Sequence, residues 1–490
     1  MKRMICVHGH FYQPPREDPW TRAVPNEPSA SPFDNWNSRI TEECYRPMGC
    51  AKVHATERHG ERVINNYEWM NFNIGPTLLR WLATEAPEVI AKLKHADQAS
   101  IERWGAGNAI AQSYHHAILP LCTERDRRTE LEWSKAVFRQ TFGRDPEGLW
   151  LPEAAVDLAT LESVARAGFR FVILAPRQCK AVRAPGATAY RDVSGVETAR
   201  AYGVPLPSGR KIAAFFYHGP LSQAVAFEQL LDDGERFAQR LRGEALRSPV
   251  REGLTHIATD GESYGHHHRF GEMALAYALM RLTESDDVAL TNYSAYLNAH
   301  PAQWDALIHE PSSWSCAHGV ERWRSNCGCG MRDERRWTHG WRVPLRAALE
   351  TLRDQIAFAY ERALAPLVRD CWQLRDEYEA AAIADLIDPL LDAHAVAPLA
   401  DDERTRLYRW LSLQRDSLAM FASCGWFFDD PIGLEPTNNL KTAARAIEQL
   451  EELSGEEVGE EFFESLRGWP TAGNAAPAWR EHILGERPKA

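Results

Sequence analysis

The sequence contains no apolar run long enough to cross a membrane as a helix. No span approaches the roughly 20 consecutive apolar residues that a transmembrane helix needs. After the basic pair at the start, only four apolar residues, Met4 to Val7, precede histidines and a glutamine. We therefore expect neither a membrane span nor a secretory signal. We predict a cytoplasmic protein whose ten cysteines are mostly reduced.

The sequence has fewer basic than acidic residues. The chain has 56 lysines and arginines against 68 aspartates and glutamates, which gives a formal net charge of −12. Nucleic-acid-binding proteins carry a basic face, and anionic membranes attract basic segments, so both kinds of partner are disfavoured. A neutral substrate is compatible with this charge. The sequence also lacks internal repeats and low-complexity tracts, and it leaves the oligomeric state open.

The composition is that of a globular protein, with 44% hydrophobic and 25% charged residues in a chain of 490. That length is sufficient for two or three packed units. The seventeen tryptophans are a high number. Some must fill the core, and others are suited to stacking against the C–H faces of sugar rings.

Strand-like and helix-like segments alternate over the first three hundred residues. Short apolar runs at 4–7, 171–174, 212–217 and 255–260 are separated by helical patterns. This alternation predicts a parallel α/β barrel spanning 1–310, in which residues just past the strand ends gather at one face. A polar stretch at about 20–75, rich in Pro, Asn and Trp, is expected to be a long insertion at the rim.

The character of the sequence changes after the barrel. Apolar residues recur with a spacing of four, three and four at Leu345, Leu349, Leu352 and Ile356, and β-branched runs almost vanish. This periodicity predicts amphipathic helices. We expect 311–490 to contain a cysteine-bearing loop followed by a helical domain.

Two carboxylates stand in glycine- and aromatic-rich segments that follow strand-like runs. Glu153 ends GLWLPE and Asp260 opens DGESYGHHH. Two acids held across a sugar-sized gap are the minimum equipment of a glycoside hydrolase or transglycosidase. The alternative for each acid is a helix cap or a backbone amide partner. Glu262, two residues beyond Asp260, is either a supporting partner or a rival for the acid role.

Two histidine segments are candidates for substrate contact. In HGHFYQPP (8–15), His10 and Gln13 follow the first strand and can hydrogen-bond sugar hydroxyls, with metal ligation or a structural role as the alternatives. In HHAILPL (115–121), one histidine, His116, faces the cleft in the functional interpretation, and both are ordinary half-buried histidines in the other.

The segments HGHFYQPP, HHAILPL, GLWLPE and TDGESYG, in this order, resemble those of glycoside hydrolase family 57, the α-glucan-active family of amylases, glucanotransferases and branching enzymes. The resemblance implies a (β/α)7 barrel, a retaining mechanism, Glu153 as nucleophile and Asp260 as general acid/base. It also implies that His10 and His116 contact sugar and that Trp150 matches an aromatic of the third motif. The stretch 313–329 is unlike that of the well-known amylases and closer to a less-characterised subgroup with a helical extension.

This stretch admits three interpretations. Cys316, His318, Cys327 and Cys329 have the residue types of a tetrahedral zinc site, but C-x-H-x8-C-x-C is not a standard spacing and C-x-C pinches the ligand geometry. A loop lining the substrate site, or a plain structural segment, are the other two. We expect no metal and no cofactor. Trp426, in GWFFDD, either reaches the substrate or packs an interface.

The sequence thus predicts a retaining α-glucan-active enzyme of the amylase, 4-α-glucanotransferase or branching type. The rivals are a metal-dependent polysaccharide deacetylase and a non-catalytic glucan-binding protein. The residues predicted to bind substrate are His10, Gln13, His116, Trp150, Glu262, His318, Arg322, Trp323 and Trp426.

Overall fold

The computed structural model describes residues 2–54, 61–331 and 338–467, and the chain folds into two compact units. The barrel unit comprises 1–13, 26–112 and 138–314, and the helical unit comprises 14–25, 113–137 and 315–490. Two segments inside the range predicted for the barrel domain, 14–25 and 113–137, therefore belong to the helical unit. The last part of the predicted second domain, 468–490, lies outside the described residues.

The barrel unit is built on a row of parallel strands, and the predicted (β/α)7 fold class is confirmed. The row runs β12 (Leu254–Asp260), β1 (Arg3–Phe11), β4 (Asn71–Ile74), β5 (Ala109–Gln112), β6 (Gly148–Trp150), β7 (Phe171–Leu174) and β11 (Lys211–Phe216). The N–H of His218, just after β11, donates to the carbonyl oxygen of His256 on β12 at 2.7 Å, which links the two ends of the row. The residues just past these strands are thereby gathered at one rim.

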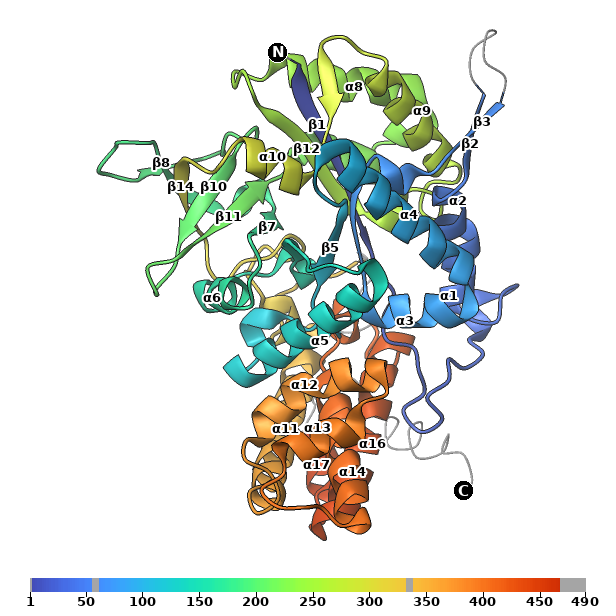
Figure 1. Ribbon diagram of the computed structural model, residues 1–490, viewed down its shortest axis with the longest axis vertical. Coiled ribbons are helices and arrows are strands. Elements are labelled where there is room, and N and C mark those ends of the chain that lie inside the picture. The colour runs from blue at the N-terminus through green and yellow to red at the C-terminus, as the bar shows by residue number, and fades with distance from the viewer. Residues whose placement is uncertain (1, 55–60, 332–337, 468–490) are drawn as a thin grey trace. The chain divides into compact units, whose positions relative to one another are not determined.

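Four of these strands, β1, β7, β11 and β12, form at the predicted apolar runs, whereas β4, β5 and β6 lie outside them. All four residues of β7 are buried, as are five of the six in β11. Parallel strands are covered on both faces, so continuous apolar sequence is expected in them. The helices of the first 310 residues are α1 (Trp36–Ile40), α2 (Arg46–Met48), α3 (Pro76–Glu85), α4 (Pro87–Trp104), α5 (Glu124–Phe142), α6 (Leu158–Arg166), α7 (Gly219–Phe227), α8 (Gly234–Arg247), α9 (Gly271–Thr283) and α10 (Tyr293–Ala299). Helices α8 and α9 pack against each other near β1 and β12 (Figure 1).

Further strands extend this sheet beyond the row. β10 (Ala201–Pro205) pairs antiparallel with β11 and parallel with β14 (Trp304–Ile308). β8 (Cys179–Arg183), β9 (Arg191–Asp192) and β13 (Val288–Leu290) complete the sheet, and β2 (Ala51–His54) pairs with β3 (Glu61–Ile64) separately. The rim insertion predicted at about 20–75 is shorter than expected, because its last residues form β4 inside the row.

The helical unit contains the predicted amphipathic helices. The apolar residues at 345, 349, 352 and 356 all lie on α11 and are buried, which confirms the helical periodicity. Helices α11, α14 and α16 pack against one another (Figure 1). The helices after residue 340 are α11 (Arg342–Leu364), α12 (Cys371–Ala384), α13 (Ile387–His394), α14 (Asp401–Ala419), α15 (Cys424–Phe427), α16 (Leu434–Ser454) and α17 (Gly459–Arg467).

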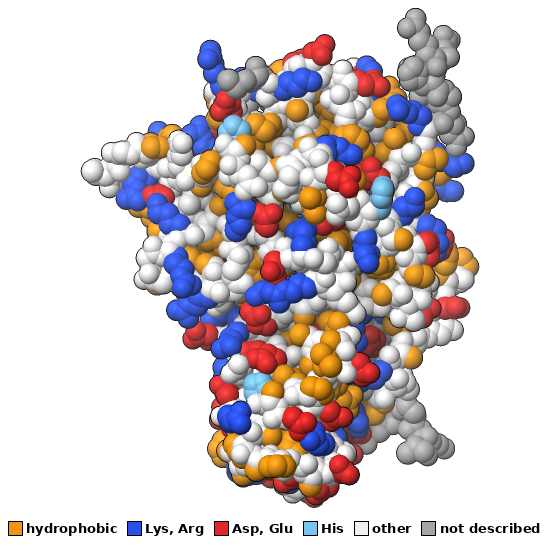
Figure 2. Space-filling view, viewed as in Figure 1, with side chains coloured by type: hydrophobic (Ala, Val, Ile, Leu, Met, Phe, Trp, Pro, Cys, Tyr) orange, Lys and Arg blue, Asp and Glu red, His pale blue; other side chains and the backbone are white. Residues whose placement is uncertain are grey.

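The surface mixes charges of both signs. On the face shown in Figure 2, lysines and arginines are interspersed with aspartates and glutamates among the described side chains. That pattern differs from the continuous basic stripe of a nucleic-acid-binding surface. Among the described residues, no helix is both long enough and apolar enough to span a bilayer.

Candidate active site

The register of the parallel strands places several predicted residues at neighbouring strand ends. His10 on β1 is paired with Asp260 on β12 and with Asn73 on β4. One step along the row, Gln112 on β5 is paired with Trp150 on β6. Because parallel strands end at one rim, these side chains belong to one site. Asn73 and Gln112 also belong to this site, although neither is among the residues predicted from the sequence. In the sequence they are marked only as polar residues within short apolar strands.

Glu153 lies in a tight turn directly after β6. Its φ angle is 56° and that of Ala154 is 47°, so two consecutive non-glycine residues occupy the left-handed region. Such conformations are costly, and they persist where the surroundings hold them and cluster at functional sites. Here the N–H of Ala154 donates to Leu151 O at 2.8 Å and that of Ala155 to Pro152 O at 2.9 Å. The turn fixes the point from which the Glu153 carboxylate projects.

Trp314 hydrogen-bonds to both the side chain and the backbone of Glu153. Its indole Nε1–H donates to Glu153 Oε2 at 3.0 Å, and its backbone N–H donates to Glu153 O at 2.9 Å. The neighbouring residues Val156 and Ser312 exchange backbone hydrogen bonds of 2.9 and 3.0 Å. The Glu153 turn is therefore bound to a segment far away in sequence. The indole N–H donor fixes the orientation of the Glu153 carboxylate.

Asp260 is the other carboxyl group of the predicted pair. It is accessible to solvent at the end of β12, but surrounding protein desolvates it, and the negative charge of Glu153 lies close by. Desolvation first and the Glu153 charge second raise the pKa of Asp260 from 3.8 to about 7. Much of Asp260 is then protonated at neutral pH. One ionised and one protonated carboxyl group is the arrangement that divides nucleophile from general acid.

Glu262 is buried just behind Asp260. Its Oε1 accepts the backbone N–H of Tyr12 at 3.0 Å and the hydroxyl of Tyr45 at 2.6 Å. Burial raises the pKa of Glu262 to about 8, with a further contribution from the charge of Asp260. The predicted direct substrate contact is corrected here, because this buried carboxyl group holds the loop after β1. Gln13 lies in this loop after β1, and its Nε2 group donates to Tyr12 O at 3.0 Å.

His10 lies over the indole of Trp150, with ring centroids 4.8 Å apart and an interplanar angle of 18°. The Asn73 Nδ2 group donates to His10 Nδ1 at 2.9 Å, which leaves the ring proton on Nε2. His8 stacks on the same indole at 5.1 Å. Trp150 is 0% exposed, so the predicted contact of its ring with sugar is corrected to a packing role beneath the two histidines.

Three other aromatic side chains keep accessible surface near the acids. Tyr12 stacks on His10 with centroids 5.9 Å apart, and Trp314 contacts Tyr217 edge to face at 6.4 Å. All three are partly exposed. Tyr12, Tyr217 and Trp314 are thus better candidates for sugar stacking than the buried tryptophans. The signal that the sequence offers for Tyr217 is its position directly after the apolar run of β11.

The remaining predicted residues belong to the helical unit. His116 is buried, its Nδ1 lies 2.7 Å from Ser423 Oγ, and burial lowers its pKa to about 3. Trp323 and Trp426 are each 0% exposed. Arg322 is also buried, and its guanidinium donates to Phe427 O and to Ser315 O. The predicted substrate contacts of Arg322, Trp323 and Trp426 are corrected to internal packing, because none of these side chains offers a free face.

The cysteine-bearing loop gathers four candidate ligands. The side chains of Cys316, His318, Cys327 and Cys329 place one ligand atom each within 4.8 Å of one another. The C-x-H-x8-C-x-C spacing argues against such a cluster, but the structure brings the four side chains together. His318 therefore points to the cysteines, and its predicted role in sugar binding has no support from this arrangement.

Comparison with known proteins identifies the barrel. The model of Glycosyl hydrolase family 57 matches residues 7–304, which is more than half of the chain. The chain belongs to glycosyl hydrolase family 57. The match includes His10, Glu153 and Asp260 within its range. A second match, to the Domain of unknown function (DUF3536), covers 337–484.

Two α-amylases are similar to short parts of this family 57 chain. "Alpha-amylase 1" of Dictyoglomus thermophilum is 25% identical over 152 residues, which are 31% of this chain and 20% of the amylase. An α-amylase of Pyrococcus horikoshii is 29% identical over 102 residues, which are 21% of this chain and 15% of the amylase. The matched segments therefore span a fifth or less of these relatives.

Solved structures resemble the family 57 chain over most of its length. An exo-type maltose-forming amylase from Pyrococcus sp. ST04 has a TM-score of 0.71 at 15% identity, covering 94% of this chain and 82% of the amylase. A branching enzyme from Pyrococcus horikoshii has a TM-score of 0.58 at 13% identity, covering 100% and 98%. At these identities the likeness establishes the fold.

Proposed function

We propose that this family 57 chain is a retaining glycosidase or transglycosidase acting on α-glucans. The observation that carries the proposal is the pair formed by Glu153 and Asp260, in which desolvation by the surrounding protein and the neighbouring Glu153 charge raise the pKa of Asp260 to about 7. The amylase and branching activities in the names of the similar proteins support the choice of α-glucan.

The reaction has two steps. In the first, Glu153 Oε attacks the anomeric carbon and forms an ester, while Asp260 gives its proton to the glycosidic oxygen as the C–O bond breaks. In the second, ionised Asp260 takes a proton from water or from a sugar hydroxyl, whose oxygen displaces Glu153 from the anomeric carbon. Water as acceptor gives hydrolysis, and a sugar hydroxyl gives transfer or branching.

The surrounding residues suit a neutral ring substrate. The Nε2–H of His10 is a neutral donor, and Tyr12, Tyr217 and Trp314 offer partly exposed rings. Aromatic faces and neutral donors bind sugars without requiring a charged ligand. The rival deacetylase reaction needs an Asp and two His on a metal, whereas the ring nitrogens of His8 here lie 2.7 Å from Asn71 Oδ1 and 3.1 Å from Asn73 Oδ1, both amide groups.

Incubation with maltoheptaose tests the proposal and separates the activities within it. Shorter chains alone indicate hydrolysis, a mixture of shorter and longer chains indicates 4-α-transfer, and new branch points indicate branching. Proton NMR of the first products should show retention of the α configuration. Inverted products, or unchanged maltoheptaose and amylose at any enzyme concentration, would refute the proposed function.

Trp314→Phe is expected to lower kcat by roughly 10- to 100-fold, since a hydrogen bond to a charged group is worth about 1.5–3 kcal/mol. The variant keeps a ring against Tyr217 but removes the Nε1–H donor at 3.0 Å from Glu153 Oε2. Steady-state kinetics on maltoheptaose measure the loss. Trp304→Phe, on β14, is the control for a general effect of tryptophan loss. Equal kinetics for the two variants would exclude the proposed role of Trp314.

Glu262→Gln is expected to retain activity within about threefold at pH 7, because a carboxyl group with a raised pKa near 8 is mostly protonated there and Gln imitates that form. Glu262→Ala should lose about tenfold or more, since it leaves the buried partners at Tyr12 and Tyr45 without their acceptor. Kinetics at pH 7 compare the two variants. A loss in Glu262→Gln as large as that in Asp260→Asn would transfer the acid role to Glu262.

A further inference from the structure

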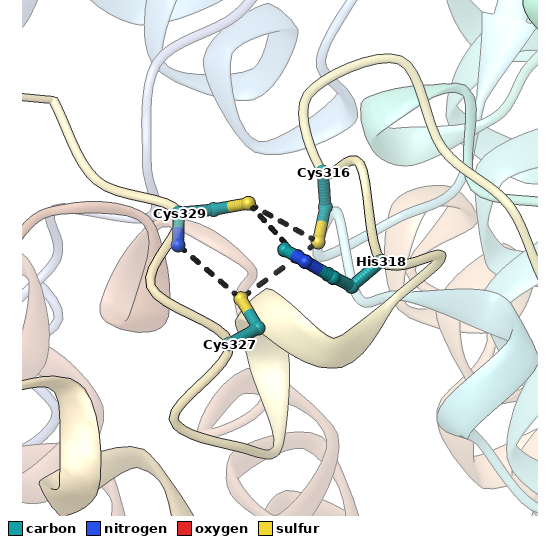
Figure 3. A group of neighbouring side chains, drawn as sticks. All are labelled: Cys316, His318, Cys327 and Cys329. Atoms are coloured by element: carbon teal, nitrogen blue, oxygen red, sulfur yellow. Dashed lines mark hydrogen bonds between the residues drawn. The ribbon is translucent and has the colours of Figure 1, made fainter.

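The loop between Ser315 and Met331 in the helical unit contains little regular structure. Its one short helical turn is Glu321–Trp323. From both sides of this turn, four side chains point to a common centre (Figure 3): Cys316, His318, Cys327 and Cys329. Three thiols and one imidazole form a ligand set that zinc uses in structural sites.

Three of the six separations between the ligand atoms fit a tetrahedral ion, and all six are within 4.8 Å. Cys316 Sγ lies 3.9 Å from Cys327 Sγ and 3.8 Å from Cys329 Sγ, and Cys329 Sγ lies 3.5 Å from His318 Nδ1. Around zinc, Zn–S bonds of about 2.3 Å at a tetrahedral angle hold two sulfurs about 3.8 Å apart, and a Zn–N bond of about 2.0 Å gives roughly 3.5 Å between sulfur and nitrogen.

A disulfide does not explain the same geometry. Bonded sulfurs lie about 2.03–2.05 Å apart, and all three cysteines here are free. Three of the separations match the edges of a ligand tetrahedron. Thiols are weak hydrogen-bond donors, so hydrogen bonds between them give little reason for the side chains to converge.

The backbone solves the difficulty posed by the C-x-C spacing. Gly328, between Cys327 and Cys329, has a φ angle of 82°, which glycine adopts without strain. The turn brings both sulfurs to one side of the loop. It also lets the N–H of Cys329 donate to Cys327 Sγ at 3.5 Å, a contact that orients the sulfur.

Two buried arginines fix the loop and bring positive charge to it. Arg342 Nη1 donates to Cys329 O at 2.9 Å, and Arg322 Nη1 donates to Ser315 O at 3.1 Å. Three thiolates around one Zn²⁺ leave a net charge of −1 at a site that is half-buried, with Cys316 buried and His318 exposed, so nearby positive charge is favourable. The guanidinium groups of Arg322 and Arg342 supply that charge.

We propose that Cys316, His318, Cys327 and Cys329 bind one Zn²⁺ in a closed, structural site. The ion ties the two ends of the loop together. The site itself is independent of the proposed glycosidase activity.

Metal analysis of the full chain, purified without chelators, tests the proposal. Plasma mass spectrometry should find about one zinc per chain, and Cys327→Ser should lose most of it. Cys371→Ser, a half-buried cysteine on α12 outside the cluster, should keep the full content. His318→Cys should also keep it, because a fourth thiolate completes the tetrahedron.

Readouts on the wild-type chain keep the test valid if Cys327→Ser does not fold. Reduced metal-free protein titrated with Co²⁺ should develop thiolate charge-transfer absorption that saturates at one equivalent. Zn²⁺ should then displace the Co²⁺ and raise Tm. Lack of stoichiometric uptake of either ion, or a disulfide within the cluster found by mass spectrometry of the freshly isolated chain, would overturn the proposal.

Discussion

Glu153→Gln should lower kcat for maltoheptaose on the order of 10⁴-fold or more, the scale seen when a covalent nucleophile is removed. The amide keeps an oxygen for the Trp314 donor at 3.0 Å, so the turn and the fold are expected to survive. The amide is too weak a nucleophile to attack the anomeric carbon. Circular dichroism and Tm report the fold, and product assays report the loss.

Glu147→Gln is the matched control. Glu147 directly precedes β6, at the opposite end from Glu153, and pairs with Arg170 on the surface. A surface ion pair contributes about 0–1 kcal/mol, so this change should leave activity unaltered. Wild-type rates in Glu153→Gln would exclude Glu153 as the nucleophile.

Rescue by an external nucleophile distinguishes direct attack by Glu153 from a role in positioning the substrate. In Glu153→Ala the space left by the carboxylate admits azide, which attacks an activated α-glucosyl fluoride from the face that Glu153 used. The expected product is a β-glucosyl azide. Rescue that yields the α product, or no rescue despite a folded protein, would contradict direct attack by Glu153.

The acids could be predicted from the sequence because their signal is local. A carboxylate directly after an apolar strand lies at the rim of a parallel barrel, whichever helices intervene. The alternating segments that predict the barrel carry Glu153 and Asp260 at those ends, and the register of β1 with β12 places Asp260 opposite His10. The order of the four motifs predicted the family, and the comparison with known proteins confirms it.

The contacts that tune these acids could not be predicted. Trp314 donates to a carboxylate 161 residues earlier in the chain, and nothing near either residue encodes that pairing. Burial also depends on contacts distant in sequence. Nothing in the sequence distinguishes Trp150, Trp323 and Trp426 from the other tryptophans, and only the packing of the fold covers their rings. Accessible aromatic residues had to be found from the fold.

The spacing of Cys316, His318, Cys327 and Cys329 in the sequence argued against their convergence for a related reason. Spacing rules describe common loops, whereas the Cys316 cluster depends on the left-handed conformation at Gly328 and on contacts with Arg342 in a later helix. The division into units shows the same limit. Segments 14–25 and 113–137 lie among barrel strands in sequence but pack in the helical unit.

Asp260→Asn should lower kcat for natural glucans by about 10²- to 10⁴-fold, the usual contribution of a general acid. The loss should be smaller for the first step with aryl glycosides, since a good leaving group departs without a proton. Pre-steady-state release of the aryl alcohol measures that step. Asp192→Asn, at an exposed position on β9, is the control and should leave both rates unchanged. An equal loss for both kinds of substrate would contradict the acid role.

The raised pKa of Asp260 also fixes two dependences on pH. The active acid is protonated, so wild-type kcat/KM should fall as pH rises through about 7, and Asp260→Asn should lack that limb. Between the unfolded value of 3.8 and about 7, the folded state binds more protons than the unfolded state, so its stability falls as pH rises. The Tm of Asp260→Asn relative to wild type should therefore increase from pH 5 to pH 8. A constant difference would mean that Glu153 and burial do not perturb this carboxyl group.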